Sequence, residues 1–198
     1  MKNGDALAIF SLVKPSAALL PSYIAALRAG WSPNNLRAEA TIRAHLAAIE
    51  TGAAAFLATL EDPEGRNPPV ILPDGSTVPR LPSITRWATD GTFCGAISLR
   101  WQTGHAALPP YVLGHIGYSI VPEKRGAGCA TQALRALLPE ARAIGLAFVE
   151  LTTEPDNIAS QRVILANGGR LVERFTKPVA YGGGDAWRYR IDLTRHAS

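Results

Sequence analysis

A glycine-rich segment near the middle of the chain restricts the fold more than any other part of the sequence. It consists of Ile120-Val121-Pro122-Glu123-Lys124-Arg125-Gly126-Ala127-Gly128-Cys129-Ala130. An apolar strand ends there, a tight turn follows, and a helix begins on glycine-rich backbone. The exposed amides at a helix start, together with the positive end of the helix dipole, bind phosphate groups well. Gly126 and Gly128 let the backbone approach an anion closely, and Arg125 can add a charge-assisted contact.

Two interpretations of this segment stay open from its residues alone. The glycines form either a phosphate site or only a tight strand-to-helix turn. The segment is not a P-loop, because the Gly-Lys-Ser/Thr ending is absent, and it lacks the dinucleotide spacing Gly-x-Gly-x-x-Gly. The choice between a ligand site and a plain turn therefore depends on other parts of the chain.

The apolar pattern predicts an α/β (α+β) fold with a mixed sheet and helices on its faces. Strands are expected at residues 7–13, 70–72, 84–89, 92–101, 112–121, 147–152, 171–176 and 186–193, and helices at 16–28, 36–50, 126–144 and 158–166. In the third helix, apolar residues from Leu134 to Ala141 recur at i, i+3, i+4 and i+7, which indicates one buried face. Asp90-Gly91 between two strand-like runs predicts a hairpin turn.

The composition favours a single packed domain over residues 1–198. Hydrophobic residues make up 47% of the chain and charged residues 18%, which is typical of a globular protein. Residues 61–82 are rich in proline and predict an extended surface connection rather than a second domain. No apolar run approaches the ~20 residues that a bilayer requires, so no membrane partner is expected. Two cysteines, Cys94 and Cys129, suggest no disulfide framework and fit a reducing cytoplasm.

The charge pattern argues against a nucleic-acid partner. The formal net charge is +4, but lysine and arginine are dispersed, and the longest basic cluster is the pair Lys124 and Arg125. A nucleic-acid binder concentrates such charge on one face, with aromatic residues among it. A solvated surface with a slight excess of positive charge is the simpler interpretation.

The glycine segment resembles the acyl-CoA signature of the GNAT superfamily of N-acetyltransferases, Arg/Gln-x-x-Gly-x-Gly/Ala, here Arg125 to Ala130. A later segment, Asp156 to Ser160, resembles the family's Asn-x-x-Ala/Ser motif and is followed by a helix and glycines. One helix and one strand lie between the two motifs, which is the family's order. The resemblance covers residues 77–193 and is nearest to uncharacterised bacterial predicted acetyltransferases with a Gly-His-Ile-Gly-Tyr strand and an Asp-Asn-Ile-Ala-Ser turn. The N-terminal third matches only in the order of its elements.

This resemblance implies a GNAT-like fold with a mixed, mostly antiparallel sheet of six to seven strands and helices on both faces. It also implies acetyl-CoA as a co-substrate, without a metal. The strand before the loop is expected to splay from the next strand and to pair with the pantetheine arm through the backbone of Ile120 and Val121. The other residues implied to bind the cofactor are Arg125, Gly126, Ala127, Gly128, Cys129 and Ala130 at the pyrophosphate, and Asn157 and Ser160 at the pantetheine.

Acyl transfer to an amine benefits from a base, because a lysine-like amine with a pKa of about 10.4 is charged at pH 7. His115 lies on the strand leading to the loop, where many relatives place a glutamate base, and its ordinary pKa near 6.5 suits the task. Glu154, at the end of the following strand, is the second candidate. Each has a plainer interpretation: a histidine packed against a neighbouring strand, and a solvated carboxylate beside a turn.

Two positions depart from the family pattern. The family often uses a tyrosine in the later helix as the acid for the leaving thiolate, and that position is Ile164 here. Tyr118 or Ser119 can substitute, and a thiolate with a pKa near 8.5 needs little help. Oxyanion stabilisation would come from a backbone amide near Ser119 or Ile120. Gly169 replaces the family phenylalanine after the late glycine, which concerns local packing rather than chemistry.

The sequence thus predicts an acyl-CoA-dependent N-acyltransferase in which a primary amine directly attacks acetyl-CoA in a ternary complex. The alternative is a catalytically degenerate module that senses acyl-CoA, an interpretation favoured by the missing tyrosine. The acceptor, a small-molecule or peptide amine, stays open, and a homodimer is suggested only by analogy. Candidate residues for the acceptor pocket are Tyr23, Trp31, Tyr181, Trp187 and Arg100.

Overall fold

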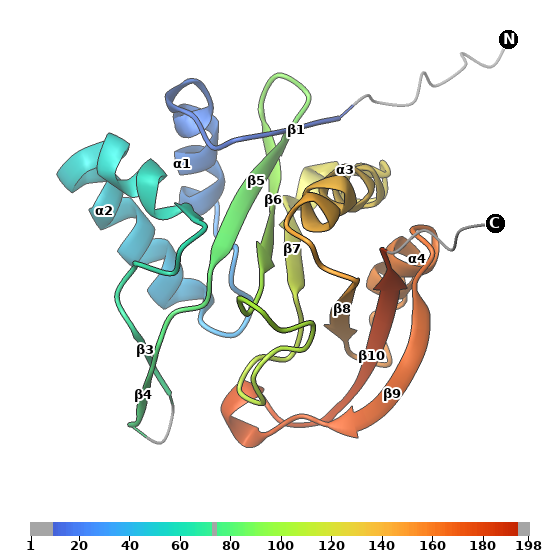
Figure 1. The fold of residues 1–198 in the computed structure, drawn as a ribbon. Coiled ribbons are helices and arrows are strands. Elements are labelled where there is room, and N and C mark those ends of the chain that lie inside the picture. Colours follow the sequence, from blue (N-terminus) through green and yellow to red (C-terminus); the bar gives the residue numbers. More distant parts are fainter. Residues whose placement is uncertain (1–9, 73–74, 194–198) are drawn as a thin grey trace, which may run out of the picture.

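A five-stranded antiparallel sheet forms one half of the fold (Figure 1). The computed structural model describes residues 10–72 and 75–193. The strands of this sheet are β1 (Ser11–Val13), β2 (Glu61–Asp62), β5 (Ser83–Thr89), β6 (Phe93–Arg100) and β7 (Ile116–Ile120). Their order is β1-β5-β6-β7, and β2 also pairs with β5. The predicted hairpin at Asp90-Gly91 is confirmed, since it joins β5 to β6.

A second, three-stranded sheet forms the other half of the fold. It consists of β8 (Phe148–Thr153), β9 (Arg170–Thr176) and β10 (Asp185–Asp192), in the order β8-β10-β9. A separate short hairpin of β3 (Val70–Ile71) and β4 (Thr77–Val78) lies in the proline-rich connection. The predicted α/β class is confirmed. Among the described residues no strand ladder joins β7 to β8, so the sheet is divided there, where the sequence predicted a splay.

Helices lie on both faces of the five-stranded sheet (Figure 1). On one face are α1 (Leu20–Arg28) and α2 (Ala38–Thr59), and on the other is α3 (Cys129–Ala143). The last helix, α4 (Ile158–Leu165), packs against α3 and β8. Single 3-10 turns occur at η1 (Ala17–Leu19), η2 (Pro122–Lys124) and η3 (Val179–Tyr181). No helix within residues 10–72 and 75–193 is long and apolar enough to span a bilayer.

The alternation of side chains along the strands separates two hydrophobic clusters. Ile97 and Leu99 of β6 pack in the cluster that includes α3, whereas Phe93 and Ala96 pack in the cluster with α1 and α2. Successive strand residues point to opposite faces. From Ala96 onward, the even-numbered residues of β6 therefore face α1 and α2, as do the odd-numbered residues of β5 and β7, and the remaining ones face α3. The register irregularity between β5 and β6 reverses this parity at Phe93 and Cys94.

Several element boundaries differ from the sequence-based predictions. The helix expected over 36–50 continues to Thr59. Gly52, which was expected to end it, has non-helical dihedrals (φ −177°, ψ 98°), but the chain resumes the helix after this kink. The strand expected over 112–121 is reduced to β7, because the His115 amide donates to the Glu150 carbonyl, at 2.7 Å, in the other sheet. The helix expected from residue 126 begins at Cys129. Of the first predicted strand, residues 7–9 lie outside the described part of the chain.

A buried charge network fastens α3 to the first sheet. Arg86 of β5 is 6% exposed, and its Nη2 lies 2.7 Å from Oε2 of Glu140 on α3. The same guanidinium pairs with Glu61 of β2. Burial lowers the pKa of Arg86, but the hydrogen bonds and charges of the two glutamates outweigh burial and raise it. The network therefore links three elements that are far apart in the sequence.

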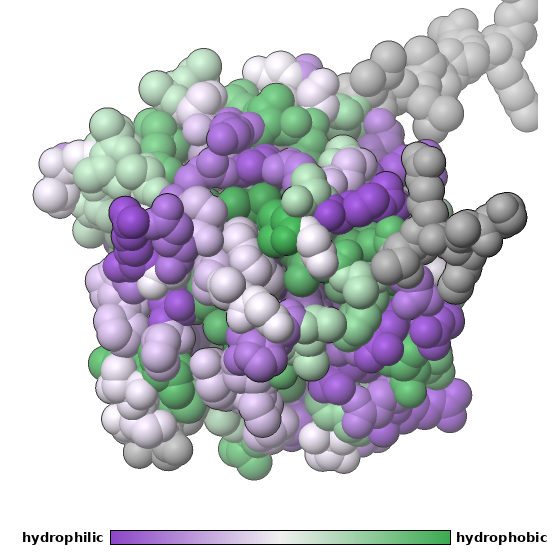
Figure 2. Space-filling view, in the orientation of Figure 1, coloured by the Kyte–Doolittle hydropathy of each residue, from purple (hydrophilic) through white to green (hydrophobic). Residues whose placement is uncertain are grey.

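The surface differs in character between the two halves of the molecule. In Figure 2, the region of α2 is mildly hydrophobic, in keeping with its many exposed alanines, and hydrophilic side chains gather over β9 and β10. The second sheet presents paired charges there, including Arg188 with Glu173 at 2.5 Å. These paired charges belong to a solvated sheet face.

Candidate functional site

The loop between β7 and α3 presents a row of unused backbone amides. Gly126 and Gly128 have φ values of +77° and +80°, in the left-handed region that favours glycine. Residues 125–128 are exposed. The first amides of a helix have no intrahelical partner, and in the described part of the chain the amides from Gly126 to Ala130 donate to no acceptor. Such amides, together with the positive end of the α3 dipole, can hold an anion.

Two cationic side chains lie at this loop, and they differ in whether their charge is already paired. Lys124 Nζ lies 2.5 Å from Asp90 Oδ2, so its charge is already paired. Arg125 Nε donates to the Ile120 carbonyl oxygen at 3.0 Å, which holds the side chain against the end of β7. No described residue uses the two terminal nitrogens of this guanidinium. Arg125 is therefore the cation that an anion at the loop would meet.

The backbone of β7 has one edge paired with β6 and one edge open. Val121 N donates to the Cys94 carbonyl at 3.0 Å, which fixes the parity of the ladder. In an antiparallel pair the peptide groups alternate between the two edges, so those of Ser119 and Val121 face β6. The peptide groups of Tyr118 and Ile120 point to the open edge, on the side of the break between the two sheets.

Ile120 and Val121 were both expected to pair with the pantetheine, but their amides face opposite edges of β7. The Val121 amide is bonded to β6 and its carbonyl accepts from Lys124 N at 3.0 Å, so both backbone groups of Val121 are already used within the protein. The Ile120 carbonyl is bonded to Arg125, but the Ile120 amide lies on the open edge without a partner among the described residues. Of the two amides considered for oxyanion stabilisation, at Ser119 and Ile120, the one at Ile120 is available.

The start of α4 lies close to this open edge. Asn157 caps the helix, because its Oδ1 accepts from Ser160 N at 3.0 Å. Ser160 Oγ lies 2.9 Å from Tyr118 Oη, which bridges β7 to α4. Burial raises the pKa of Tyr118, so its hydroxyl stays protonated at neutral pH. The structure thus brings Asn157, Ser160 and Tyr118 together beside the open edge of β7.

The loop, the open edge and the capped helix all lie within the segment that a protein-family model matches. The model describes an acetyltransferase (GNAT) domain and matches residues 72–170. The chain belongs to the GNAT acetyltransferase family. No curated protein sequence matches this acetyltransferase significantly.

Solved structures share the fold of this acetyltransferase across almost its whole length. YncA, a putative acetyltransferase from Salmonella typhimurium solved with acetyl-CoA, is 17% identical with a TM-score of 0.54, and 96% of each chain is covered. RimJ from Mycobacterium smegmatis, in complex with CoA-disulfide, is 18% identical with a TM-score of 0.61, covering 94% of this chain and 83% of that one. A GNAT acetyltransferase from Streptococcus pneumoniae is 12% identical with a TM-score of 0.58, covering 94% and 100%. At these identities the likeness concerns the fold.

The structure gives His115 a packing role rather than the predicted role of base. The side chain is fully buried, its Nδ1 accepts from Glu150 N at 3.0 Å, and its Nε2 lies 3.2 Å from the Ala106 carbonyl oxygen. This pattern requires the proton on Nε2, and both ring nitrogens are then used. Burial lowers the pKa of His115, which keeps the ring neutral. The geometry therefore leaves His115 no free lone pair with which to accept a proton from an incoming amine.

A buried neutral histidine predicts a specific pH dependence of stability. Because the folded-state pKa of His115 lies below its unfolded value near 6.5, its contribution is complete above pH 6.5 and is lost as the pH falls through the folded pKa. We expect the free energy of unfolding, from urea melts between pH 7.5 and 5, to fall by up to about 1.4 kcal/mol per pH unit more in wild type than in His115→Gln. His45 shifts in the same direction and is unchanged in both proteins, so the difference isolates His115. A steeper fall in the variant, or loss of acetyl transfer at full stability, would contradict a packing role.

Glu154 is also poorly suited to the role of base. Its carboxylate pairs with Lys177 Nζ, and this hydrogen bond lowers the pKa of Glu154. A carboxylate with a lowered pKa accepts a proton less readily. Its backbone carbonyl accepts from Gln161 Nε2 at 3.3 Å, so the residue helps to position the turn before α4.

Most of the aromatic residues considered for an acceptor pocket belong to the core. Tyr23 and Trp31 are 1% and 4% exposed and pack with α1 and α2, and Trp187 packs against the other cluster. The Tyr181 hydroxyl donates to the Tyr111 carbonyl and fixes the loop before β10. Burial also raises the pKa of the Cys129 thiol to about 12, so this residue packs at the start of α3 as an inert side chain.

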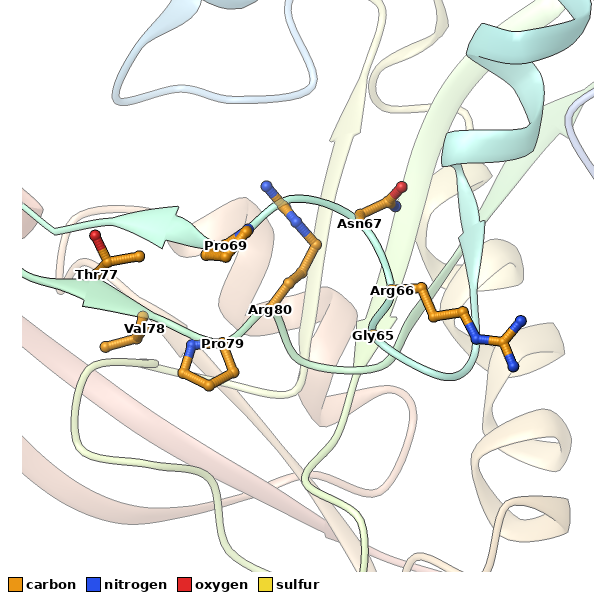
Figure 3. Close-up of a pocket in the computed structure, with 8 residues that line it drawn as sticks. All are labelled: Gly65, Arg66, Asn67, Pro69, Thr77, Val78, Pro79 and Arg80. Atoms are coloured by element: carbon orange, nitrogen blue, oxygen red, sulfur yellow. The ribbon is translucent and has the colours of Figure 1, made fainter.

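A shallow, open hollow of the surface lies away from this site. It has a volume of about 440 Å³ and is lined by residues of the proline-rich connection, where Arg80 lies across the space between β4 and the loop before β3 (Figure 3). Arg80 Nε donates to the Pro68 carbonyl at 2.8 Å, which indicates a structural role for this side chain. Across residues 10–72 and 75–193, no cluster of histidine, cysteine, aspartate and glutamate is arranged to hold a metal ion.

Proposed function

We propose that this GNAT acetyltransferase binds acetyl-CoA at the 125–130 loop and along the open edge of β7, and transfers the acetyl group to a primary amine. The observation that carries the proposal is a row of unused loop amides continuous with an open strand edge. A diphosphate needs hydrogen-bond donors and positive charge, and an amide-rich arm needs a strand edge. The chain offers both on adjacent residues, which fits one extended ligand better than two separate ones.

Each residue of the site has a proposed role in binding. The amides from Gly126 to Ala130 and the guanidinium of Arg125 hold the pyrophosphate. The Ile120 amide and the Tyr118 carbonyl, both on the open edge, pair with the pantetheine, as a strand would. Asn157 and Ser160, at the start of α4, contact the same arm from the other side of the break. The fold is shared with YncA and RimJ, whose solved structures contain acetyl-CoA and CoA-disulfide.

The chemistry proposed is direct acyl transfer in a ternary complex. The amine nitrogen attacks the thioester carbonyl carbon, a C–N bond forms, the C–S bond breaks, and the proton lost by the amine balances the charge of the departing thiolate. The Tyr118 amide, the open-edge donor farther from the loop, donates to the carbonyl oxygen as it gains negative charge. Tyr118, which burial keeps protonated, gives its proton to the thiolate in place of the family tyrosine that is Ile164 here, and the proton that the amine releases to water restores the tyrosine hydroxyl. With His115 and Glu154 both engaged elsewhere, water takes the proton of the amine.

Two features bear on the acceptor and on the setting. An α-amine with a pKa near 8 loses its proton at pH 7 at a cost of only about 1 kcal/mol, whereas a lysine-like amine costs about 4.6 kcal/mol. A site without a strong base therefore favours an α-amine or another amine of low pKa. Cys94 and Cys129 are free thiols, which supports a reducing, cytoplasmic setting.

Calorimetry and a thiol-release assay with a panel of amines test the proposal. We expect micromolar binding of acetyl-CoA and thiol release that depends on the amine, with low-pKa amines reacting faster at pH 7. Tyr118→Phe should lower kcat by roughly 10-fold, less than is usual for a general acid because a thiolate needs little help. It should leave the Kd for acetyl-CoA unchanged. Tight binding without turnover on any amine favours the sensor alternative, and absence of binding overturns the cofactor site.

A further inference from the structure

One glycine of β7 is not required by the packing of the fold. Gly117 lies inside the strand, where glycine is unfavourable because it loses more conformational freedom on folding than any other residue. Its φ lies outside the positive range, so any residue can adopt its backbone conformation. Apart from its chain neighbours, a Cβ built on Gly117 would meet a single described atom within 4 Å, Arg100 Nη2 at 3.7 Å, which is an ordinary contact. The fold itself would therefore accept a side chain here.

Two nearby glycines differ from Gly117 in this respect. A Cβ on Gly95 would lie 2.6 Å from the Ser119 carbonyl oxygen. A Cβ on Gly114 would lie 3.0 Å from the Glu150 carbonyl oxygen, so both glycines allow strands to approach one another. Gly117 is exposed instead, and the ladder between β6 and β7 keeps one register throughout, without a bulge. Of the usual reasons for a glycine inside a strand, close approach of a ligand is the one that remains.

A side chain at residue 117 would project from the sheet face that carries α1 and α2. Gly117 is paired with Ser98, and Arg100, two residues further along β6, lies on the same face. The hydrophobic cluster under α1 and α2 includes Ala96 and Val121, but it extends to neither Ser98 nor Gly117. Gly117 therefore lies on a part of this face that the two helices leave uncovered.

The uncovered backbone of Gly117 is adjacent to the proposed position of the acyl group. The Tyr118 amide, to which we assign the thioester oxygen, is joined to the Gly117 carbonyl carbon, so its nitrogen is two bonds from the Gly117 Cα. With a hydrogen bond of about 2.9 Å, the thioester oxygen lies within roughly 5–6 Å of that Cα. On the opposite face of the sheet, the Tyr118 side chain packs against the core and bonds to Ser160. An amine therefore reaches the acyl carbon from the face on which Gly117 is bare.

We propose that Gly117 is a specificity-determining residue whose missing side chain leaves room for a substituent on the carbon that bears the acceptor's amine. The amine nitrogen bonds to the acyl carbon, so the carbon attached to that nitrogen lies one bond further out, and its substituent lies over Gly117. The acceptor class is thus a primary amine on a branched carbon rather than on an unbranched chain. The inference rests on the proposed acetyl transfer and describes the acceptor of that same site.

A series of acceptors and a series of side chains at residue 117 test this assignment. Glycinamide, alaninamide and valinamide have α-amines with pKa values near 8, so they differ mainly in the branch beside the amine. We expect wild type to use all three in the thiol-release assay. Gly117→Val should lower kcat/KM for valinamide by roughly 10- to 100-fold, as for groups forced into a filled space, and for glycinamide by less than about threefold. Gly117→Ala should have an intermediate effect. Both variants should keep the Kd for acetyl-CoA and melt no lower than wild type, because the strand gains a residue that favours it. Ser11→Val adds similar bulk at the exposed start of β1, at the other end of the strand order, and should change no acceptor.

The outcomes separate this inference from the proposed function. Unchanged use of valinamide by Gly117→Val, or an equal loss for all three amides, overturns the role of Gly117 and leaves acetyl transfer standing. A loss of acetyl-CoA affinity in the variants assigns the space to the cofactor, and a lower melting temperature of both variants assigns the glycine to the fold. Either result also overturns the inference. Failure of every amine to release thiol in wild type, despite bound acetyl-CoA, overturns the proposed function and this inference with it.

Discussion

Gly128→Glu is expected to weaken acetyl-CoA binding by roughly 100-fold or more, equivalent to about 2.7 kcal/mol. Gly128 is the N-cap of α3, and its φ of +80° strains any residue with a Cβ. A carboxylate on this residue lies among the amides that we assign to the pyrophosphate, where it repels the phosphates and occupies the donors. Calorimetric titration with acetyl-CoA measures the loss directly.

Gly145→Glu is the matched control for this prediction. Gly145 follows the other end of α3, also has a positive φ, of +95°, and a Cβ there meets no atom within 4 Å. The substitution adds the same backbone strain and the same charge, but far from the loop. We expect its affinity for acetyl-CoA to stay within about twofold of wild type, although its stability falls because the charge is unfavourable at a helix C-terminus. Equal affinity of the two variants would falsify the placement of the phosphates.

The sequence predicted the loop well because the loop is local. Its conformation depends on the positive φ of Gly126 and Gly128 and on the start of an apolar helix stripe, and both are encoded within a few residues. The N-cap at Asn157 was predictable for the same reason, since the acceptor and the donor are three residues apart. Local geometry of this kind is visible in a spacing of residue types.

The role of single peptide groups and side chains was not predictable in this way. Which edge of β7 the Val121 amide faces depends on the register with β6, and one residue of shift would exchange Ile120 and Val121. His115 suggested a base because its residue type and strand fit one, yet contacts with Ala106 and Glu150, set by tertiary packing, use both ring nitrogens. The contact of the Tyr118 hydroxyl with Ser160 was not predictable either, because it depends on α4 folding back beside β7.

The glycine that replaces the family phenylalanine has a physical reason that only the structure reveals. A Cβ on Gly169 would lie 2.3 Å from Ile164 Cγ2 and 2.9 Å from the Ile164 carbonyl oxygen. The Gly169 amide donates to that same carbonyl at 3.0 Å, so the chain passes very close to the end of α4. The two departures from the family pattern, at Ile164 and Gly169, are therefore a single packing arrangement.

Arg86→Met is expected to destabilise the fold by about 2–4 kcal/mol. Removing one partner of a buried ion pair leaves the other charge uncompensated, typically at a cost of about 3–5 kcal/mol. The lower range applies because the side chains of Glu61 and Glu140 are 30% and 36% exposed and keep some hydration. Urea melts at pH 7 measure the change, and Arg28→Met, which removes an exposed arginine of α1, should change stability by less than about 0.5 kcal/mol.

The same network predicts how acid acts on the fold. Burial raises the pKa of Glu61, but its hydrogen bonds to Lys14 and Arg86 outweigh burial, so the folded-state pKa is lowered from 4.5. A lowered carboxyl pKa contributes stability that is complete above the unfolded value and is lost as the pH falls through the folded value. Wild type should therefore lose stability below about pH 4.5 more steeply than Arg86→Met, in which Lys14 alone holds the carboxylate. Parallel acid limbs for the two proteins would show that Glu61 and Arg86 are not coupled in solution.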